Sequence, residues 1–140
     1  MPGEVIHLLS ERNRYLSQFC VLNRVQIERL KKNNFEQLSE FYLMREQILA
    51  IVEKIEHLIH QKAESYNGPI DAQNREKIQS LLTEKDKIIK DIVDQDLAIL
   101  SSIEKEKTNI ITELKVLQKG RKVISSYKSG NRNSKIDEEA

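Results

Sequence analysis

The feature that most constrains this chain is an apolar stripe that repeats at alternating steps of three and four residues. Between Val5 and Gln61 neither glycine nor proline interrupts the pattern. Such steps keep the side chains on one face of an α-helix with an effective period of about 3.5 residues. We therefore predict one continuous helix over about residues 4–66. Its stripe is Leu9, Leu16, Phe19, Leu22, Ile27, Leu30, Leu38, Phe41, Met44, Ile48, Val52, Ile55 and Ile59.

The segment ESYNGPID breaks this pattern. We expect Asn67 or Gly68 to adopt the left-handed conformation that ends a helix, and Pro69 cannot continue one. Asp71 is expected to cap the next helix, because its carboxylate can accept hydrogen bonds from the free N–H groups that follow. A second stripe then begins, again with no proline. It comprises Ile78, Leu82, Ile89, Ile92, Ile99, Ile103, Ile110, Leu114, Leu117 and Ile124.

Two amphipathic helices joined by a short hinge predict an all-α fold, a long antiparallel helical hairpin of coiled-coil type. Short connections favour antiparallel neighbours, and each buried Leu or Ile contributes roughly 1.5–3 kcal/mol. The step from lysine to Gly120 is expected to end the second helix. The expected parts are a hairpin domain over 1–128 with helix 4–66, hinge 67–70, helix 71–119 and short helix 121–128, and a flexible polar tail over 129–140.

Composition excludes several other classes. Four glycines and two prolines leave too few turns for a β-sandwich or an α/β fold. A net charge of +1 lacks the one-sided basic surface of a nucleic-acid binder. No apolar run approaches the roughly 18 residues that span a bilayer, and the start of the chain does not have the form of a signal peptide. We expect a cytoplasmic protein with no nucleic-acid partner and no membrane insertion.

Residues that bear reactive or metal-binding groups are few. His57 and His60 lie on a helix with carboxylates nearby, but two turns of one helix supply only part of a zinc shell, so we interpret them as solvated surface residues and expect no metal site. Cys20, the single cysteine, is expected to be a small buried apolar residue and not a nucleophile. No phosphate loop or nucleophile elbow is present. The sequence therefore predicts neither an enzyme nor a cofactor.

Charged residues fall on the second stripe at Asp96 and Glu106. They are either long side chains that reach water from a leaky seam, or polar groups that set the register of the hairpin. A hinge centred near Gly68 would place Glu106 beside Lys31 or Lys32, and Asp96 beside the neighbouring aromatics Phe41 and Tyr42.

Adjacent apolar pairs such as Ile51–Val52 and Ile110–Ile111 make both stripes wider than a two-helix seam requires. A broad apolar face indicates a third packing surface. The residues leave three candidates for what covers it, namely a homodimer partner, the chain's own tail or the helix of a client protein.

The order of these features resembles the flagellar type III export chaperones of the FlgN class, with the FliT class a close second. The run YLSQFCVLNRVQIERLKKNNFEQLSEFYLMREQILAIVEKIEHL resembles the family's opening helix, with Gln26, Leu30, Leu38 and Arg45 at its landmark positions. The ending LQKGRKVISSYKSGNRNSKIDEEA resembles the family's close, which has a Lys-Gly step, a tyrosine, a polar linker and an Ile-Asp pair.

This resemblance implies a cytosolic chaperone that holds hook–filament junction subunits and delivers them to the cytoplasmic domain of the export gate. It implies that the client's amphipathic terminal helix binds Leu114, Leu117, Val123 and Ile124, and that Tyr127 contacts the gate. The near-neutral charge departs from the family, whose members are often acidic. The competing interpretations are a coiled-coil stalk or tether, for example one like the export-ATPase stalk, and a polar tail that is only a solvent-facing end.

Overall fold

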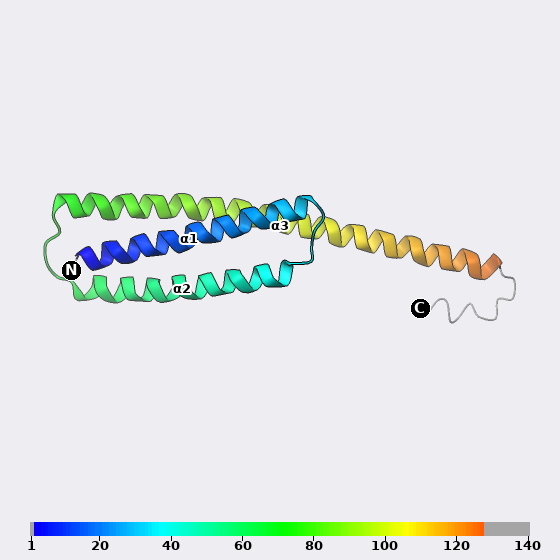
Figure 1. The fold of residues 1–140 in the computed structure, drawn as a ribbon, viewed down its shortest axis with the longest axis horizontal. Helices are drawn as coiled ribbons and strands as arrows, with labels where there is room; N and C mark the ends of the chain where they lie inside the picture. Colours follow the sequence, from blue (N-terminus) through cyan, green and yellow to red (C-terminus); the bar gives the residue numbers. More distant parts are fainter. Residues whose placement is uncertain (1, 128–140) are drawn as a thin grey trace. The chain divides into compact units, whose positions relative to one another are not determined.

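The computed structural model describes the backbone of residues 2–127 and the side chains of residues 2–120, and all regular structure in that range is helical. The elements are α1 (Pro2–Lys31), α2 (Leu38–Ser65) and α3 (Ala72–Tyr127) (Figure 1). The predicted all-α fold is thus confirmed. The chain divides into two compact units, a first unit Met1–Leu100 and a second unit Ser101–Ala140. The expected tail over 129–140 lies outside the described residues.

The predicted continuous first helix is interrupted, because α1 ends at Lys31 and α2 begins at Leu38. Asn33 adopts the left-handed conformation with φ of 58°. Its N–H donates to the carbonyl of Leu30 at 3.0 Å, and that of Asn34 donates to the carbonyl of Arg29 at 3.0 Å. These two bonds form a Schellman motif, in which asparagine replaces the usual glycine. The expected single helix over 4–66 is therefore two helices.

Within the first unit, α1 and α2 run antiparallel (Figure 1). Residue numbers rise along α1 as they fall along α2, since Glu4 pairs with Lys62 at 3.4 Å and Arg12 pairs with Glu56 at 2.9 Å.

The first part of α3 runs parallel to α1. Asn13 donates to the carbonyl of Leu81 at 2.9 Å, and the Cys20 thiol lies 3.8 Å from the carbonyl of Ile88. The first unit is therefore a three-helix arrangement, in which α1 lies against both α2 and α3.

The core of this unit follows the 3.5-residue period, with α1 as its most buried helix. Nine α1 residues are buried, against three on α2, because α1 packs against both other helices. On α3 the inward positions within this unit include Ile78, Leu81, Ile88, Ile92 and Ile99. The sequence pattern assigned Leu82 and Ile89 to this face, but they remain 37% and 38% exposed.

The second connection contains the predicted cap. Asp71 accepts a hydrogen bond from the N–H of Asn74 through Oδ1 at 2.7 Å, which satisfies a free donor of the first turn of α3. The predicted left-handed helix end at Asn67 or Gly68 is wrong, since neither has a positive φ. Tyr66 instead ends α2 in an extended conformation.

The ring of Tyr66 covers Gly68. A Cβ at Gly68 would lie 2.7 Å from the Tyr66 hydroxyl, and that hydroxyl donates to the carbonyl of Pro69 at 2.7 Å. Close approach of a side chain, and not a positive φ, is therefore what favours glycine here.

The predicted end of the second helix at 119 is also wrong, because α3 continues through Gly120 to Tyr127 without a separate short helix. A glycine costs about 1 kcal/mol relative to alanine inside a helix. That cost is too small to end a helix whose neighbouring residues favour it.

Candidate functional site

The second unit presents an apolar stripe on α3. Every side chain between residues 107 and 120 is exposed. Ile110, Leu114 and Leu117 follow one another at steps of four and three, which places them on one face of the helix. Leu114 and Leu117 are 54% and 60% exposed. We call the face formed by these three residues the α3 stripe.

Two of the four residues that the sequence assigned to client binding, Leu114 and Leu117, thus lie on the α3 stripe. Val123 and Ile124 belong to the same helix, and Tyr127 is its last residue. The side chains of these three residues lie outside the described part of the chain, and their roles stay predictions.

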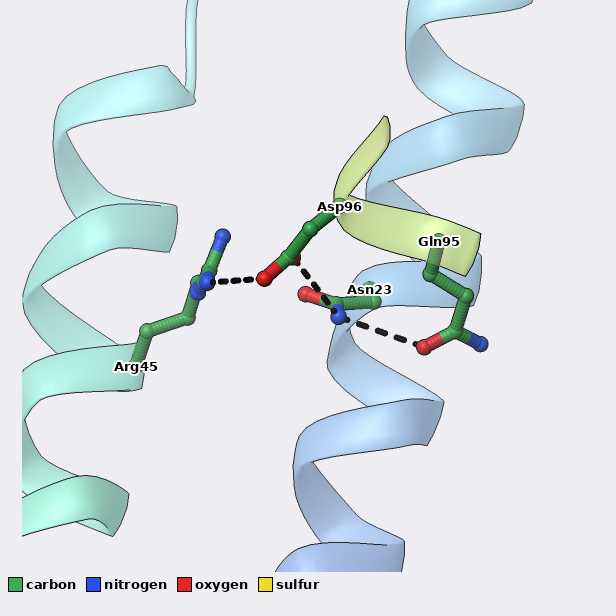
Figure 2. A network of polar contacts seen from close by, with 4 residues as sticks. All are labelled: Asn23, Arg45, Gln95 and Asp96. Carbon is green, nitrogen blue, oxygen red and sulfur yellow. Dashed lines mark hydrogen bonds and ion pairs between the residues drawn. The ribbon is translucent and has the colours of Figure 1, made fainter. Parts of the chain in front are cut away.

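A polar network crosses the core of the first unit and joins its three helices (Figure 2). The Asn23 amide donates to Gln95 at 3.2 Å and to Asp96 Oδ1 at 3.3 Å. The second oxygen of Asp96 accepts from Arg45 at 3.1 Å. Both oxygens of this carboxylate are therefore engaged in holding helices together.

Aromatic rings surround the guanidinium of this network. The Arg45 carbon Cζ lies 4.6 Å from the centroid of the Phe19 ring, 5.3 Å from that of Phe41 and 5.6 Å from that of Tyr42. Cation–π attraction adds to the ion pair in such a setting. Arg45 thus connects Asp96 with Phe41 and Tyr42, the two aromatics beside which the sequence placed that carboxylate.

Further buried polar side chains on α1 have atoms without a hydrogen-bond partner among the described residues. Gln26 is 1% exposed, and neither atom of its amide has a hydrogen-bond partner among the described residues. Arg12 is 3% exposed and uses one nitrogen for Glu56, while its Nε and second terminal nitrogen have no such partner. Buried polar groups without partners destabilise a fold.

Cys20 is buried, as predicted, at 8% exposure. Burial raises the pKa of its thiol above the ordinary value, and the neighbouring carboxylates of Asp91 and Asp96 act in the same direction. The reactive thiolate is thereby disfavoured.

The two histidines that suggested a metal site are engaged along their own helix. His60 Nε2 lies 3.1 Å from Glu64, with both side chains largely exposed, and His57 Nε2 lies 3.3 Å from the amide of Gln61. Throughout the described residues, no three His, Cys, Asp or Glu side chains come together in a way that would hold a metal ion.

A groove that the sequence pattern did not predict lies between α1 and α2, and ten residues of the first unit line it. A signal for it was present. Val21 and Val25 lie beside the main stripe of α1 at a spacing of one helical turn, which indicates a second apolar face on that helix.

Comparison of the chain with protein-family models, with curated proteins and with solved structures found no significant match. Within residues 2–127, no helix has both the length and the apolar character needed to cross a membrane.

Proposed function

We propose that this protein is a cytosolic chaperone of flagellar type III export. It binds the amphipathic terminal helix of a hook–filament junction subunit, prevents its premature assembly and delivers it to the export gate. The observation that carries the proposal is the α3 stripe, whose leucines are more than half exposed at Leu114 and Leu117.

The stretch of α3 between residues 107 and 120, whose apolar side chains all face water, is a strong candidate for binding another helix. Covering each leucine contributes roughly 1.5–3 kcal/mol, and the spacing of the α3 stripe matches the seam that a second amphipathic helix would complete. An unassembled client exposes a comparable face that promotes aggregation. A helix-on-helix contact would cover both surfaces at once.

The proposed client surface continues toward the end of α3 with Val123 and Ile124. Tyr127 follows and is the proposed contact with the export gate, because a tyrosine buries an aromatic ring while its hydroxyl stays in contact with water. Client binding and gate binding would then use neighbouring but separate residues.

The test is co-purification of the full chain with candidate hook–filament junction subunits. The double variant Leu114→Glu, Leu117→Glu should lose the client, because two carboxylates would have to be desolvated in the contact. Leu97→Glu is the matched control, since Leu97 is 61% exposed on the same helix but belongs to the first unit.

Tyr127→Ala should still bind the client but reduce its export. Full binding by the double leucine variant would overturn the proposed client surface.

The second candidate is a coiled-coil stalk or tether. It is favoured by the length of α3, which is 56 residues or about 84 Å at 1.5 Å per residue. A stalk should keep its partner when the chain is ended after Lys119, whereas a chaperone that uses Val123 and Ile124 should bind its client more weakly.

A further inference from the structure

A groove on the first unit lies between α1 and α2 and has a volume of about 440 Å³. Its lining residues follow the same steps on both helices, three, one, three and four, so each helix contributes one face about three turns long. From α1 the lining is Gln18, Val21, Leu22, Val25 and Arg29, and on the other side it is the N-cap residue Gln37 followed by the α2 residues Glu40, Phe41, Met44 and Ile48.

The two faces lie in register. The antiparallel pairing that joins Glu4 to Lys62 sets Val25 level with Phe41. Phe41 is 2% exposed and forms the floor, while Val25 and Met44 are each 44% exposed and form the walls. The result is an open groove with an apolar centre, whose lining also includes the polar residues Gln18, Arg29, Gln37 and Glu40.

The length and shape of the groove fit a single helix. Each wall spans twelve residues, from Gln18 to Arg29 and from Gln37 to Ile48, or roughly 16 Å, which is three turns of an α-helix. Helix-in-groove contacts use apolar side chains at this spacing.

A second copy of the chain fits the groove poorly. Ten residues line it, whereas a stable protein–protein interface uses about 20–30 residues on each side. Two copies that met through this face would also place one hollow against another and leave space between them.

Charges on the two walls define the orientation and character of the occupant. Arg29 lies on the α1 wall and Glu40 on the α2 wall. An occupying helix would therefore be stabilised by an acidic residue on its α1 side and a basic residue on its α2 side. Charges that flank a helical seam select partners in this way.

We propose that this groove binds a three-turn amphipathic helix of a different protein, with acidic residues along its α1 edge and basic residues along its α2 edge. The groove is formed by the first unit alone and is separate from the α3 stripe, so the chain has two helix-binding surfaces. The inference does not depend on the identity of the client that binds the stripe.

The test uses a hydrocarbon-stapled helical peptide with leucine at every third or fourth residue, glutamates along one edge and lysines along the other. Stapling is needed because isolated helices of this length do not persist in water. Fluorescence anisotropy with the full chain should give a Kd below about 1 mM. A peptide of equal composition with the two charged edges exchanged should bind about tenfold more weakly.

Two variants locate the binding. Val25→Glu should weaken it at least about tenfold, because a carboxylate would be desolvated in the wall. Val93→Glu, at a 51% exposed position of α3, should leave it unchanged. Should Val25→Glu fail to fold by circular dichroism, Arg29→Glu serves instead and should abolish the preference between the two peptides.

Several outcomes would overturn the proposal. These are absence of binding, equal binding of both peptides, and loss of binding in the Leu114→Glu, Leu117→Glu variant, which would place the peptide on the α3 stripe. Concentration-dependent dimerisation that Val25→Glu abolishes would assign the groove to a second copy. The client assay of the double leucine variant is read separately, so either surface can fail without the other.

Discussion

At the scale of single residues, the first unit combines a well-spaced core with buried polar side chains. Arg12, Asn13, Asn23 and Gln26 are all buried on α1. Asn23 is bonded to two residues of α3, whereas Gln26 has no partner for its amide among the described residues. The Asn23 oxygen also lacks a partner among the described residues, so Asn23 is stabilised through its nitrogen only and Gln26 through neither atom of its amide.

We predict that Gln26→Met raises the free energy of unfolding by about 1–3 kcal/mol, because the change removes a buried amide without partners and keeps much of its volume. Urea titration followed by circular dichroism measures the change. Asn23→Leu is the contrasting variant and should destabilise the unit, because it leaves Gln95 and Asp96 without their shared donor. Destabilisation by Gln26→Met would mean that its amide is satisfied.

Cys20 provides a prediction on pH. Burial raises the pKa of its thiol above the ordinary value, so the protonated form is favoured in the folded chain. The stability contributed by this group is fully present below the thiol pKa of the unfolded chain and is lost as pH rises through the folded pKa. Alkylation by iodoacetamide, followed by mass spectrometry, should show a pH midpoint that is higher for the folded protein than for the protein unfolded in urea.

Because Cys20 is the single cysteine, the alkylation signal needs no background variant. Equal midpoints in buffer and in urea would show that the thiol is not buried.

At the scale of secondary-structure elements, one ion pair ties α2 to α3. Arg45 and Asp96 are joined at 3.1 Å with side-chain exposures of 16% and 33%, and three aromatic rings lie near the guanidinium. The sequence had placed the register-setting contact at Glu106 with Lys31 or Lys32. Lys31 pairs with Glu28 on its own helix. Glu106 belongs to the second unit, so its pairing with Lys31 or Lys32 stays a prediction.

The register role of the pair can be tested by charge exchange. Asp96→Arg and Arg45→Asp should each lower the free energy of unfolding, because each places like charges together at a partly buried site. The double variant should recover part of the loss, with a coupling energy of about 0.5–3 kcal/mol in a double-mutant cycle. Additive losses would show that the pair does not hold α2 against α3.

The same elements show how far sequence reasoning reaches. The Asp71 cap was predictable because an acidic residue lies two positions after Pro69 and before the second apolar stripe. In the structure, a hydrogen bond from the N–H of Asn74 to Asp71 confirms the cap. The break near Asn33 was missed because the expected signals for a helix end, glycine and proline, are absent there. Asparagine also tolerates the left-handed conformation, so the two adjacent asparagines were the available signal.

Which residues of α3 face the core was predicted wrongly for a different reason. Leu81–Leu82 and Ile88–Ile89 are adjacent apolar pairs, and either member fits a 3.5-residue period. The partner helix decides between them, since α1 bonds to the carbonyls of Leu81 and Ile88. The groove between α1 and α2 was not predicted because both helices were expected to be parts of one continuous helix over 4–66. Two stretches of one straight helix cannot lie side by side. The spacing of Ile110, Leu114 and Leu117 predicted that they would face the seam of the hairpin, but they are 48%, 54% and 60% exposed. Only the family resemblance indicated Leu114 and Leu117 as binding residues.

At the scale of the whole molecule, the two units differ in what stabilises them. The first has a core shared by three helices. In the second, the α3 side chains between residues 107 and 120 are exposed, so that stretch lacks the packing that accounts for most helix stability in proteins. Local opening is expected to be easiest where buried apolar contacts are fewest.

Amide hydrogen exchange of the full chain should therefore be faster in residues 107–120 than in the buried stretch of α1 between residues 9 and 30. Adding a hook–filament junction subunit that co-purifies with the chain should slow exchange in 107–120 by at least about tenfold, because helix opening then requires loss of the contact with Leu114 and Leu117. Exchange in the α1 stretch should change much less. The Leu114→Glu, Leu117→Glu variant should exchange at the unbound rate with or without the subunit.

Protection that appeared in α1 and spared residues 107–120 would instead place the client on the first unit. Because the two stretches belong to different units, a single exchange experiment separates binding at the α3 stripe from binding at the groove. Slow exchange of residues 107–120 in the free chain would contradict the proposal more directly. It would show that another part of the molecule, or a second copy, already covers the face that the client is proposed to bind.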